Sequence, residues 1–478
     1  MGARYLMGVD IGTEGLRVGI FDAKGGSVGF GSAGYETVHP HPGWAEQDPD
    51  AWWSALTEAV PAAMSDGDVA AGEIAGISVD ATSSTVLAVD ADGQPLRPAI
   101  LWMDVRASEQ AERIGATGHP ALKYNGHGAV SAEFGLPKAM WIRDREPEVY
   151  ERAEYVLDCA DWVSQRLTGE RTLSINTASC KYYFDREAGG WPSELYERVD
   201  AADLLEKLPG DVLDVGSAVG GLRRGAAEEL GLKPGTPVAE ASVDAYAGAL
   251  GLGVVKPGSL ALITGSSHVI IAQAAEAVHD PGFWGAYTDA LIPGLYAIEA
   301  GQASTGSVVA WFKNQLAGGV VAEATRRGVD PYDLLGEAAR EVPIGSDGLL
   351  VLDYFQGNRS PHTDPHARGA VSGLSLSHGL GHLYRAVLEG ICFGTEDILA
   401  TLRANGVEPD LYVISGGPAR SELWMQMHAD VSGAPLTYTE GSEGPVLGAA
   451  IQAAVGAGVF SDLPSAAEAM VHFGRTLE

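Results

Sequence analysis

Two short turns in this chain combine glycine with hydroxyl side chains, a combination that suits phosphate binding. The first contains Asp10, Gly12 and Thr13, and the second contains Thr264 and Gly265. Glycine lets the backbone approach a ligand, threonine adds a hydroxyl, and an aspartate at a strand end can hold a hydrated Mg²⁺. One such turn alone is more often an ordinary hairpin. Two of them, one at the head of each half of the chain, favour a phosphate clamp across a cleft.

The carboxylate of Asp244 begins a stretch of small residues near the middle of the chain. One interpretation is a general base in a cleft, and the other is a helix N-cap, which is the commoner role of aspartate in this setting. Alanine or glycine at positions 245, 247, 248 and 249 leaves room for a ligand against the first helical turn. This lack of bulk favours the catalytic interpretation.

Other polar or aromatic side chains follow strand-like apolar runs, namely Asp80, Trp102 and Asp104. Polar groups at strand ends bind ligands in open α/β sheets, although a tryptophan is more often a core residue. Lys181 lies between Cys180 and two tyrosines. It either donates to a sugar hydroxyl or is simply solvated, and solvation is favoured unless its neighbours form a pocket.

Two glycine-containing segments near the C-terminus would let the planar ring of a ligand lie against the backbone. Gly416 and Gly417 follow a strand-like run, and Leu447 and Gly448 belong to a second small-residue segment. Tight turns between a strand and a helix are the alternative for both. The strict Gly-x-Gly-x-x-Gly fingerprint is absent from the first βα turn, which argues against a nicotinamide-dependent polyol dehydrogenase.

Apolar periodicity places these residues on a succession of strands and helices. The runs 5–9 and 16–21 flank the first glycine turn and predict a β-hairpin. Residues 50–64 have helical spacing, and residues 74–79 form a buried-strand run that ends at Asp80. Strands that alternate with helices predict an α/β fold.

The second half of the chain repeats the opening arrangement. Residues 258–272 place a strand, a turn and another strand in succession, and residues 382–402 supply a long amphipathic helix. This faint pseudo-repeat predicts two similarly built domains, 1–252 and 253–478, that face one cleft. Glycines and a proline around residues 250–256 predict a hinge between them.

The composition is that of a folded globular protein and limits its partners. The chain of 478 residues carries 63 acidic and 31 basic side chains, a formal charge of −32 that disfavours nucleic acids and anionic membranes. Three scattered cysteines provide neither a disulfide framework nor a zinc ligand set. No apolar run approaches the roughly 18 residues of a membrane helix, and the N-terminus lacks a signal-peptide core. We therefore expect a cytoplasmic protein.

In order along the chain, these motifs resemble those of the FGGY carbohydrate kinases, relatives of hexokinase, actin and the seventy-kilodalton heat-shock chaperones. The most specific part is Gly369-Ala-Val-Ser-Gly-Leu, followed by His382-Leu and Ala386-Val-Leu-Glu389. The other matching motifs are Asp10-Ile-Gly-Thr, Gly43-Trp-Ala-Glu-Gln-Asp-Pro, Trp102-Met-Asp-Val-Arg-Ala, Ser415-Gly-Gly-Pro-Ala-Arg-Ser and Glu443-Gly-Pro-Val-Leu-Gly-Ala-Ala. The resemblance implies an α/β protein with two ribonuclease-H-like ATPase domains, of the actin and hexokinase type, around a central cleft.

The resemblance also implies an activity and a set of roles. ATP, with Mg²⁺ near Asp10, would phosphorylate a terminal hydroxyl of a small sugar or polyol, and Asp244 would act as general base. The residues implied to bind the sugar are Asp80, Ala81, Trp102, Asp104, Lys181, Asp244 and Glu299. Those implied to bind the nucleotide are Gly12, Thr13, Thr264, Gly265, Gly301, Gln302, Gly416, Gly417, Ser421, Leu447 and Gly448. Proteins of this kind are often dimers, so a homodimer is one expected assembly.

Within the family, the motifs look most like those of the ribulokinase and D-ribulose kinase branch. The segments that carry this likeness are Val79-Asp-Ala-Thr-Ser-Ser-Thr, Cys180-Lys181, Val243-Asp-Ala-Tyr-Ala-Gly and Glu299-Ala-Gly-Gln-Ala-Ser-Thr-Gly. Two departures stand out: Gly15 replaces a serine that is common in the phosphate turn, and the N-domain signature around Phe134 and Lys138 fits loosely. The expected substrate is a ketopentose such as ribulose. Xylulose, a pentitol and a four-carbon polyol or ketose are the alternatives.

A rival interpretation is a non-catalytic nucleotide switch of the actin or chaperone type. Such a protein would keep the phosphate turns but has no need of a sugar pocket. The polar and aromatic groups Asp80, Trp102, Asp104 and Lys181 therefore favour the kinase.

Overall fold

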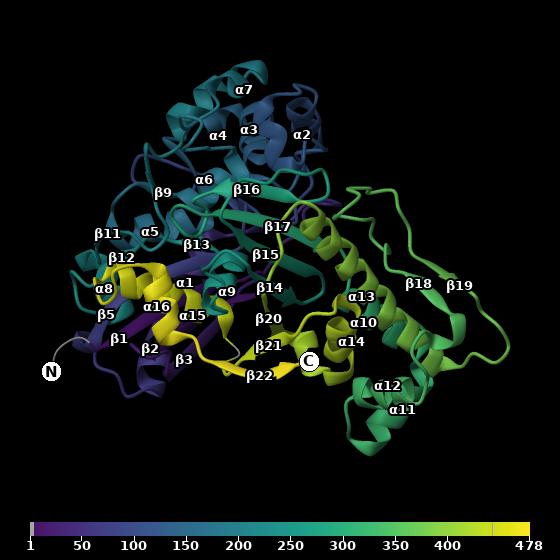
Figure 1. Cartoon of the computed structure of the whole chain (residues 1–478). Coiled ribbons are helices and arrows are strands. Elements are labelled where there is room, and N and C mark those ends of the chain that lie inside the picture. Colours follow the sequence, from purple (N-terminus) through teal and green to yellow (C-terminus); the bar gives the residue numbers. More distant parts are fainter. Residues whose placement is uncertain (1–3, 442) are drawn as a thin grey trace.

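The computed structural model describes residues 4–441 and 443–478 and contains two seven-stranded mixed sheets (Figure 1). The first sheet has the order β11-β12-β5-β1-β2-β3, with β13 also paired to β5. Its strands are β1 (Tyr5–Ile11), β2 (Gly15–Asp22), β3 (Ser27–Gly34), β5 (Ile74–Ala81), β11 (Ala218–Gly221), β12 (Pro237–Ala239) and β13 (Ser242–Val243). The second sheet has the order β16-β17-β15-β14-β20-β21-β22. Its strands are β14 (Ser259–Thr264), β15 (His268–Ala274), β16 (Trp284–Thr288), β17 (Tyr296–Gln302), β20 (Leu411–Gly416), β21 (Leu436–Thr439) and β22 (Phe473–Leu477).

The two sheets share one connectivity, which confirms the predicted α/β fold with two similarly built halves. In the first sheet β1 pairs antiparallel with β2 and parallel with β5, while in the second β14 pairs antiparallel with β15 and parallel with β20. The predicted hairpin at 5–21 and the predicted strands at 258–272 are both present. β1 and β14 are almost wholly buried, because strands covered on both faces can be apolar along their entire length.

Helices cover the outer faces of both sheets. α1 (Pro49–Asp66) packs on β2 and β3, and its N-terminus is capped by Asp48, which accepts from the Asp50 amide. The helix predicted at 50–64 is thus confirmed. The amphipathic run predicted at 382–402 forms α13 (Leu380–Ala404), the central helix of the second half. No helix among the residues that the structure describes is long and apolar enough to span a bilayer.

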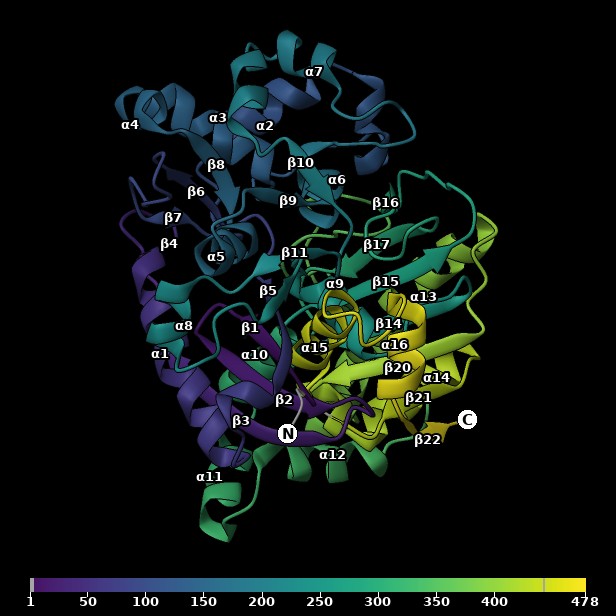
Figure 2. The same ribbon diagram turned by 90° about the vertical axis from the view of Figure 1, so that its left-hand side faces the viewer.

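Two further helices, α9 (Asp244–Gly251) and α15 (Gly444–Gly456), lie between the sheets (Figure 2). α15 belongs to the C-terminal half of the sequence but packs on β1 and β5, whereas α9 packs on β14. Glycines make this close contact feasible. A Cβ on Gly8 would lie 2.0 Å from the Val446 carbonyl oxygen, and one on Gly251 would lie 1.9 Å from that of Gly444. The hinge predicted at 250–256 therefore begins inside α9.

In each half, a group of helices and short strands lies outside the main sheet. In the first half, this group lies above the sheet in Figure 1. Its elements are α2 (Ser108–Gly115), α3 (Gly135–Arg145), α4 (Pro147–Arg152), α5 (Cys159–Thr168), α6 (Ile175–Tyr182), α7 (Ser193–Arg198) and the short strands β4 (Glu46–Gln47), β6 (Val86–Val89), β7 (Ala99–Ile100), β8 (Tyr155–Asp158), β9 (Thr172–Ser174) and β10 (Asp211–Leu213). α8 (Arg224–Leu230) packs beside α1.

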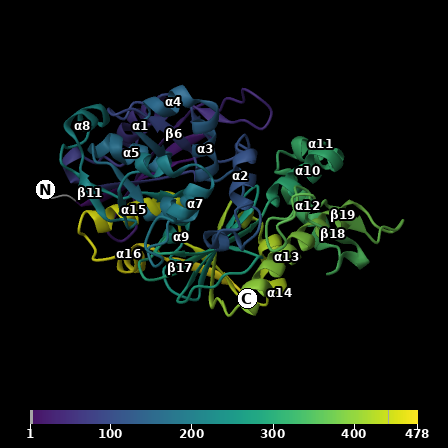
Figure 3. The same ribbon diagram turned by 90° about the horizontal axis from the view of Figure 1, so that it is seen from above.

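In the second half, helices and a hairpin extend to one side when the molecule is seen from above (Figure 3). They are α10 (Gly306–Leu316), α11 (Gly318–Arg327), α12 (Pro331–Arg340), β18 (Leu350–Leu352) and β19 (Ala370–Ser372). α14 (Glu422–Ser432) packs on α13, and α16 (Leu463–Met470) packs on α15.

Candidate active site

Three aspartates meet where adjacent strands of the first sheet end. Asp10 on β1 is in register with Asp80 on β5, and Asp244 directly follows β13, which pairs with the same end of β5. Asp80 is fully buried. Burial, followed by the nearby charges of Asp10 and Asp244, raises the pKa of Asp80 well above its usual range. The structure thus brings together the predicted metal ligand, the predicted base and one predicted sugar residue.

Asp244 is the first residue of α9 rather than its N-cap, which is Val243. Its Oδ1 accepts a hydrogen bond of 2.6 Å from the Ala245 amide, so the free N-terminus of the helix orients the carboxylate. Burial, followed by repulsion from Asp10, raises the pKa of Asp244 to about 7. A carboxylate with this pKa can accept a proton at neutral pH and release it again, as a general base must.

The phosphate turn that follows β1 is held from several sides. Gly12 donates to the Gly15 carbonyl at 3.0 Å, and the Gln47 side chain donates to the Thr13 carbonyl at 2.7 Å. Trp102, which is 36% exposed and so is not a core residue, donates to the Thr13 hydroxyl at 3.1 Å. Glycine at position 15 has a packing reason, because a Cβ there would lie 2.6 Å from the Ala33 carbonyl oxygen.

A second cluster of backbone turns lies at the matching end of the second sheet. Thr264 on β14 is in register with Gly416 on β20, and its hydroxyl donates to the Ser415 carbonyl at 2.7 Å. A Cβ on Gly416 would lie 1.7 Å from the Thr264 carbonyl oxygen, and its φ of +105° also requires glycine. Thr264, Gly265, Gly416 and Gly417, all predicted to bind the nucleotide, therefore lie together.

Lys181 joins the two halves of the chain beside Asp244. Its ammonium lies 3.4 Å from Glu299 Oε2 on β17 and 4.9 Å from the centre of the Phe134 ring. Tyr246, two residues beyond Asp244, donates to the same Glu299 oxygen at 3.3 Å. Lys181 is only 6% exposed, so the solvated interpretation of this lysine is wrong.

Asp104, which was predicted to bind the sugar, has its carboxylate held by protein donors. Asp104 is fully buried in an ion pair with the equally buried Arg106, at 2.7 Å, and it also accepts from the Ala45 amide at 2.6 Å. Arg106 in turn pairs with Glu46 and stacks 3.7 Å above the Trp44 ring. These contacts join the Gly43 and Trp102 motifs and occupy both oxygens of Asp104.

Replacing Asp104 by asparagine is therefore expected to destabilise the fold. Removing Asp104 leaves the buried Arg106 with Glu46 as its remaining carboxylate partner, and breaking a buried ion pair of this kind lowers the free energy of unfolding by about 3 kcal/mol. The exposed pair of Arg145 and Glu109 supplies the control, since Glu109→Gln should change this free energy by less than about 0.5 kcal/mol. Guanidinium-induced unfolding measures both. Unchanged stability of Asp104→Asn, with weaker binding of the substrate, would return Asp104 to the pocket.

Two residues that were predicted to bind the nucleotide, Gln302 and Gly448, make close contacts within the protein. The Gln302 amide is buried, where it donates to Asp353 at 2.7 Å and accepts from the Thr395 hydroxyl at 2.7 Å. A Cβ on Gly448 would lie 1.9 Å from the Ala247 carbonyl oxygen, which makes this glycine part of the crossing of α9 and α15. The Gln302 side chain and Gly448 thus serve the fold. Among the others, Gly301 lies on β17, Leu447 lies in the first turn of α15, and Ser421 is the N-cap of α14.

Arg17 is a site residue that the sequence analysis missed. From β2 it donates to Asp10 Oδ2 at 3.1 Å and to Glu443 Oε2 at 2.9 Å, and so links the phosphate turn to the start of α15. A single arginine in an otherwise buried strand directly after the turn was the available signal. Lys138, which sequence analysis placed only in a loosely fitting signature, is the second such residue.

The donor set fits a magnesium ion that arrives with a nucleotide. Within residues 4–441 and 443–478, no group of three or more His, Cys, Asp or Glu side chains is arranged to hold a metal. Mg²⁺ in phosphate-transfer sites commonly takes only one or two carboxylates and completes its shell with phosphate oxygens and water. Asp10, at the head of the phosphate turn, offers a carboxylate of this kind.

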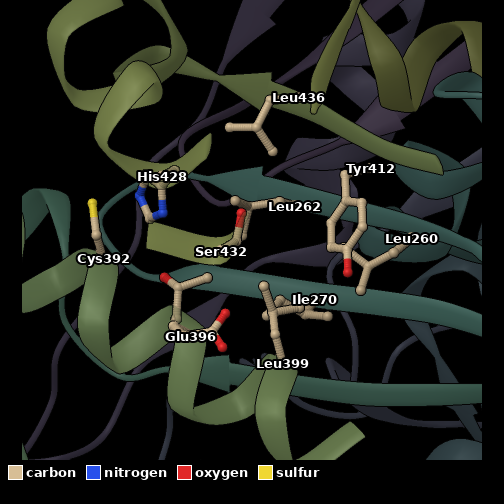
Figure 4. Close-up of a pocket in the computed structure, with 11 residues that line it drawn as sticks. Leu260, Leu262, Ile270, Cys392, Glu396, Leu399, Tyr412, His428, Ser432 and Leu436 are labelled. Atoms are coloured by element: carbon tan, nitrogen blue, oxygen red, sulfur yellow. The ribbon is translucent and has the colours of Figure 1, made fainter. Parts of the chain in front are cut away.

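A small cavity elsewhere belongs to the core of the second half and not to this site (Figure 4). It measures about 10 Å³, room for roughly one water molecule, and lies between α13, α14 and strands of the second sheet. His428 and Glu396 line it among leucine side chains. Burial lowers the pKa of His428 well below its usual range and keeps this ring neutral.

Comparisons with known proteins agree with this geometry. Residues 5–251 match the model of the N-terminal domain of the FGGY family of carbohydrate kinases, and residues 260–457 match the model of its C-terminal domain. The ribulokinase of Geobacillus thermodenitrificans is 33% identical over 492 residues, which cover 96% of this chain and 86% of that protein. The ribulokinase of Mycolicibacterium smegmatis is 34% identical over 508 residues, with 99% and 89% covered.

Solved structures are similar over the same length. The xylulose kinase from Rhodospirillum rubrum superposes with a TM-score of 0.88 at 31% identity, covering 99% of this chain and 94% of that one. The similar sequences and the similar structure thus carry the names of kinases for two different ketopentoses.

Proposed function

Since the chain belongs to the FGGY family of carbohydrate kinases, we propose that it transfers the γ-phosphate of ATP to a terminal hydroxyl of a ketopentose such as ribulose. The observation that carries this proposal is the group formed by Asp244, Lys181 and Glu299. A base with a pKa of about 7 lies beside an ion pair made by residues from both halves of the chain. Such a group suits a polar substrate with several hydroxyls.

The nucleotide would lie between the two sheets. Its phosphates would face the turns at Gly12–Thr13 and Thr264–Gly265, where threonine hydroxyls and glycine backbone allow close approach, and its adenine would lie near Gly416 and Gly417. Mg²⁺ beside Asp10 would supply charge neutralisation of the phosphates. Arg17 offers a second cation at the same end of the cleft.

The sugar would lie between Trp102, Ala81, Lys181 and Glu299, with its terminal hydroxyl toward Asp244. Asp244 would accept the hydroxyl proton as that oxygen attacks the γ-phosphorus in line with the departing ADP. The raised pKa of the buried Asp80 would weaken the repulsion between this carboxyl and the phosphates. We place the boundary between sugar and nucleotide domains at residues 252 and 253. Closure of the two would keep water, the competing nucleophile, out of the cleft.

The choice among sugars rests on names of relatives and on the Lys181–Glu299 pair. Ribulose is favoured by the ribulokinases at 33% and 34% identity. Xylulose is the second candidate, because the similar solved structure carries that name. A pentitol and a four-carbon polyol or ketose follow as less favoured candidates. A nucleotide switch is disfavoured, since it would not need a buried lysine that bridges both halves.

A coupled ADP-release assay with Mg²⁺-ATP against ketopentoses, pentitols and tetritols tests the proposal. We expect ribulose to give the highest kcat/KM in the panel. Turnover that is highest with xylulose would reassign the substrate within the family. ATP hydrolysis at one rate with and without every sugar would reject the carbohydrate kinase activity of this chain.

A further inference from the structure

Lys138 is a fully buried lysine whose ammonium is surrounded by backbone carbonyl oxygens. It lies on α3, and the three N–H groups of its Nζ are shared among four carbonyl oxygens, those of Leu101 at 2.7 Å, Ser84 and Glu133 at 2.8 Å each, and Trp102 at 3.0 Å. No carboxylate forms an ion pair with Lys138 among the residues that the structure describes. The charge is thus balanced by carbonyl dipoles and by more distant acidic groups.

The four carbonyls belong to three segments that each carry a residue of the sugar pocket. Ser84 lies three residues after Ala81, in the turn that follows β5. Leu101 and Trp102 form the loop whose indole bonds to Thr13. Glu133 directly precedes Phe134, whose ring contacts the Lys181 ammonium. One side chain therefore fixes three loops that are distant in sequence but adjacent at the pocket.

Burying the Lys138 ammonium has a free-energy cost that packing alone does not explain. Burial lowers the pKa of Lys138 to about 7, against the opposing charges of Glu133, Asp158 and Asp104. An apolar side chain of the same length would avoid this penalty, but the carbonyls of Ser84, Trp102 and Glu133 would lose the donor that Lys138 supplies, while that of Leu101 would keep only the Asp104 amide. The lysine therefore ties the ends of β6 and β7, which are paired at Val86 and Ile100, to the segment that precedes α3.

We propose that Lys138 is a positioning residue of the sugar pocket, which it assembles by binding the loops that carry Ala81, Trp102 and Phe134. This inference rests on the proposed kinase function and concerns mainly its sugar side, with Trp102 as the one link to the Thr13 turn. The nucleotide turns at Thr264 and Gly416 are formed by the second sheet and have no contact with Lys138 among those described. Loss of Lys138 should thus weaken sugar binding much more than nucleotide binding.

The test is Lys138→Met together with the milder Lys138→Gln, whose amide keeps two donors. We expect the sugar KM to rise about tenfold or more in the methionine variant and less in the glutamine variant, while the Kd of ATP changes less than about twofold. Lys207→Met is the matched control. Lys207 also donates to a backbone carbonyl, that of Ala153, but lies outside the pocket, so its replacement should leave both constants unchanged.

A double-mutant cycle distinguishes positioning from general destabilisation. If Lys138 acts through the Trp102 loop, its effect on the sugar KM should shrink in a Trp102→Phe background. Unchanged sugar KM in both Lys138 variants, or an equal loss of sugar and ATP binding, would overturn the inference while wild-type turnover still supports the kinase. Wild-type protein without sugar-dependent turnover would instead reject the proposed function, and this inference with it.

Discussion

Asp244→Asn is expected to lower kcat with the sugar by about 10²–10⁴-fold and to leave ATP binding intact. Asparagine has the same shape and can still accept the Ala245 amide hydrogen bond, so the start of α9 should be undisturbed. Only the ability to accept the hydroxyl proton is lost. Steady-state kinetics with the best sugar of the panel, beside calorimetric titration of ATP, measures the two quantities separately.

The pH dependence gives this prediction a second readout. The pKa of Asp244 is raised to about 7, so its carboxylate form, the form a base needs, predominates only above that pH. Wild-type kcat/KM should therefore fall about tenfold per pH unit below pH 6 and level off above pH 8. Since an acid with a raised pKa in the folded state opposes folding once it ionises, Asp244→Asn should be more stable than wild type at pH 8 but not at pH 4.

The residual activity of Asp244→Asn provides an internal control, because its kcat/KM should no longer change with pH near pH 7. Turnover of Asp244→Asn within a factor of two of wild type would remove Asp244 from the base role. A variant that loses ATP affinity as well would point to collapse of the cleft instead.

Lys181→Met should lower kcat/KM for the sugar by about 10²-fold, the second largest effect that we expect. The change removes a buried charge-assisted donor and leaves Glu299 beside Tyr246 alone, and truncating one partner of such a pair costs about 2–5 kcal/mol of binding. Lys123→Met is the control, because Lys123 pairs with Asp185 at 2.9 Å outside the proposed pocket.

A cycle with Glu299→Gln sharpens the test. If both residues hold the same sugar hydroxyls as a pair, the double variant should lose less than the product of the two single losses. Full additivity would mean that Lys181 and Glu299 act apart. An unchanged kcat/KM for every accepted sugar in Lys181→Met would exclude Lys181 from the pocket.

Sequence reasoning located the residues whose position follows from strand order. Asp10 and Asp80 each end an apolar run, Asp244 opens a stretch of small residues, and parallel strands bring the three to one edge of a sheet. Thr264 and Gly416 come together for the same reason. The helices at 50–64 and 382–402 were predictable because their apolar spacing matches the helical period.

What sequence reasoning could not supply was the partner of each polar side chain. Asp104 follows a strand-like run as Asp80 does, yet it forms a buried ion pair with Arg106, whose guanidinium stacks on the Trp44 ring. Gln302 ends its strand with its side chain bonded to His268, Asp353 and Thr395, all from segments far along the chain. Such choices depend on neighbours from distant segments, which a local pattern does not contain.

The crossing of α15 into the first half has a consequence for synthesis of the protein on the ribosome. Residues 444–456 cover one face of β1 and β5, strands made at the very start of translation. Until that helix emerges, nearly the whole chain has been made but Gly8 lacks its final neighbours, Val446 and Ala450, and Gly19 lacks Val446. The nascent first half therefore keeps an apolar face uncovered until then, a state in which chains are prone to aggregate. A protein truncated after residue 252 would keep that face uncovered permanently.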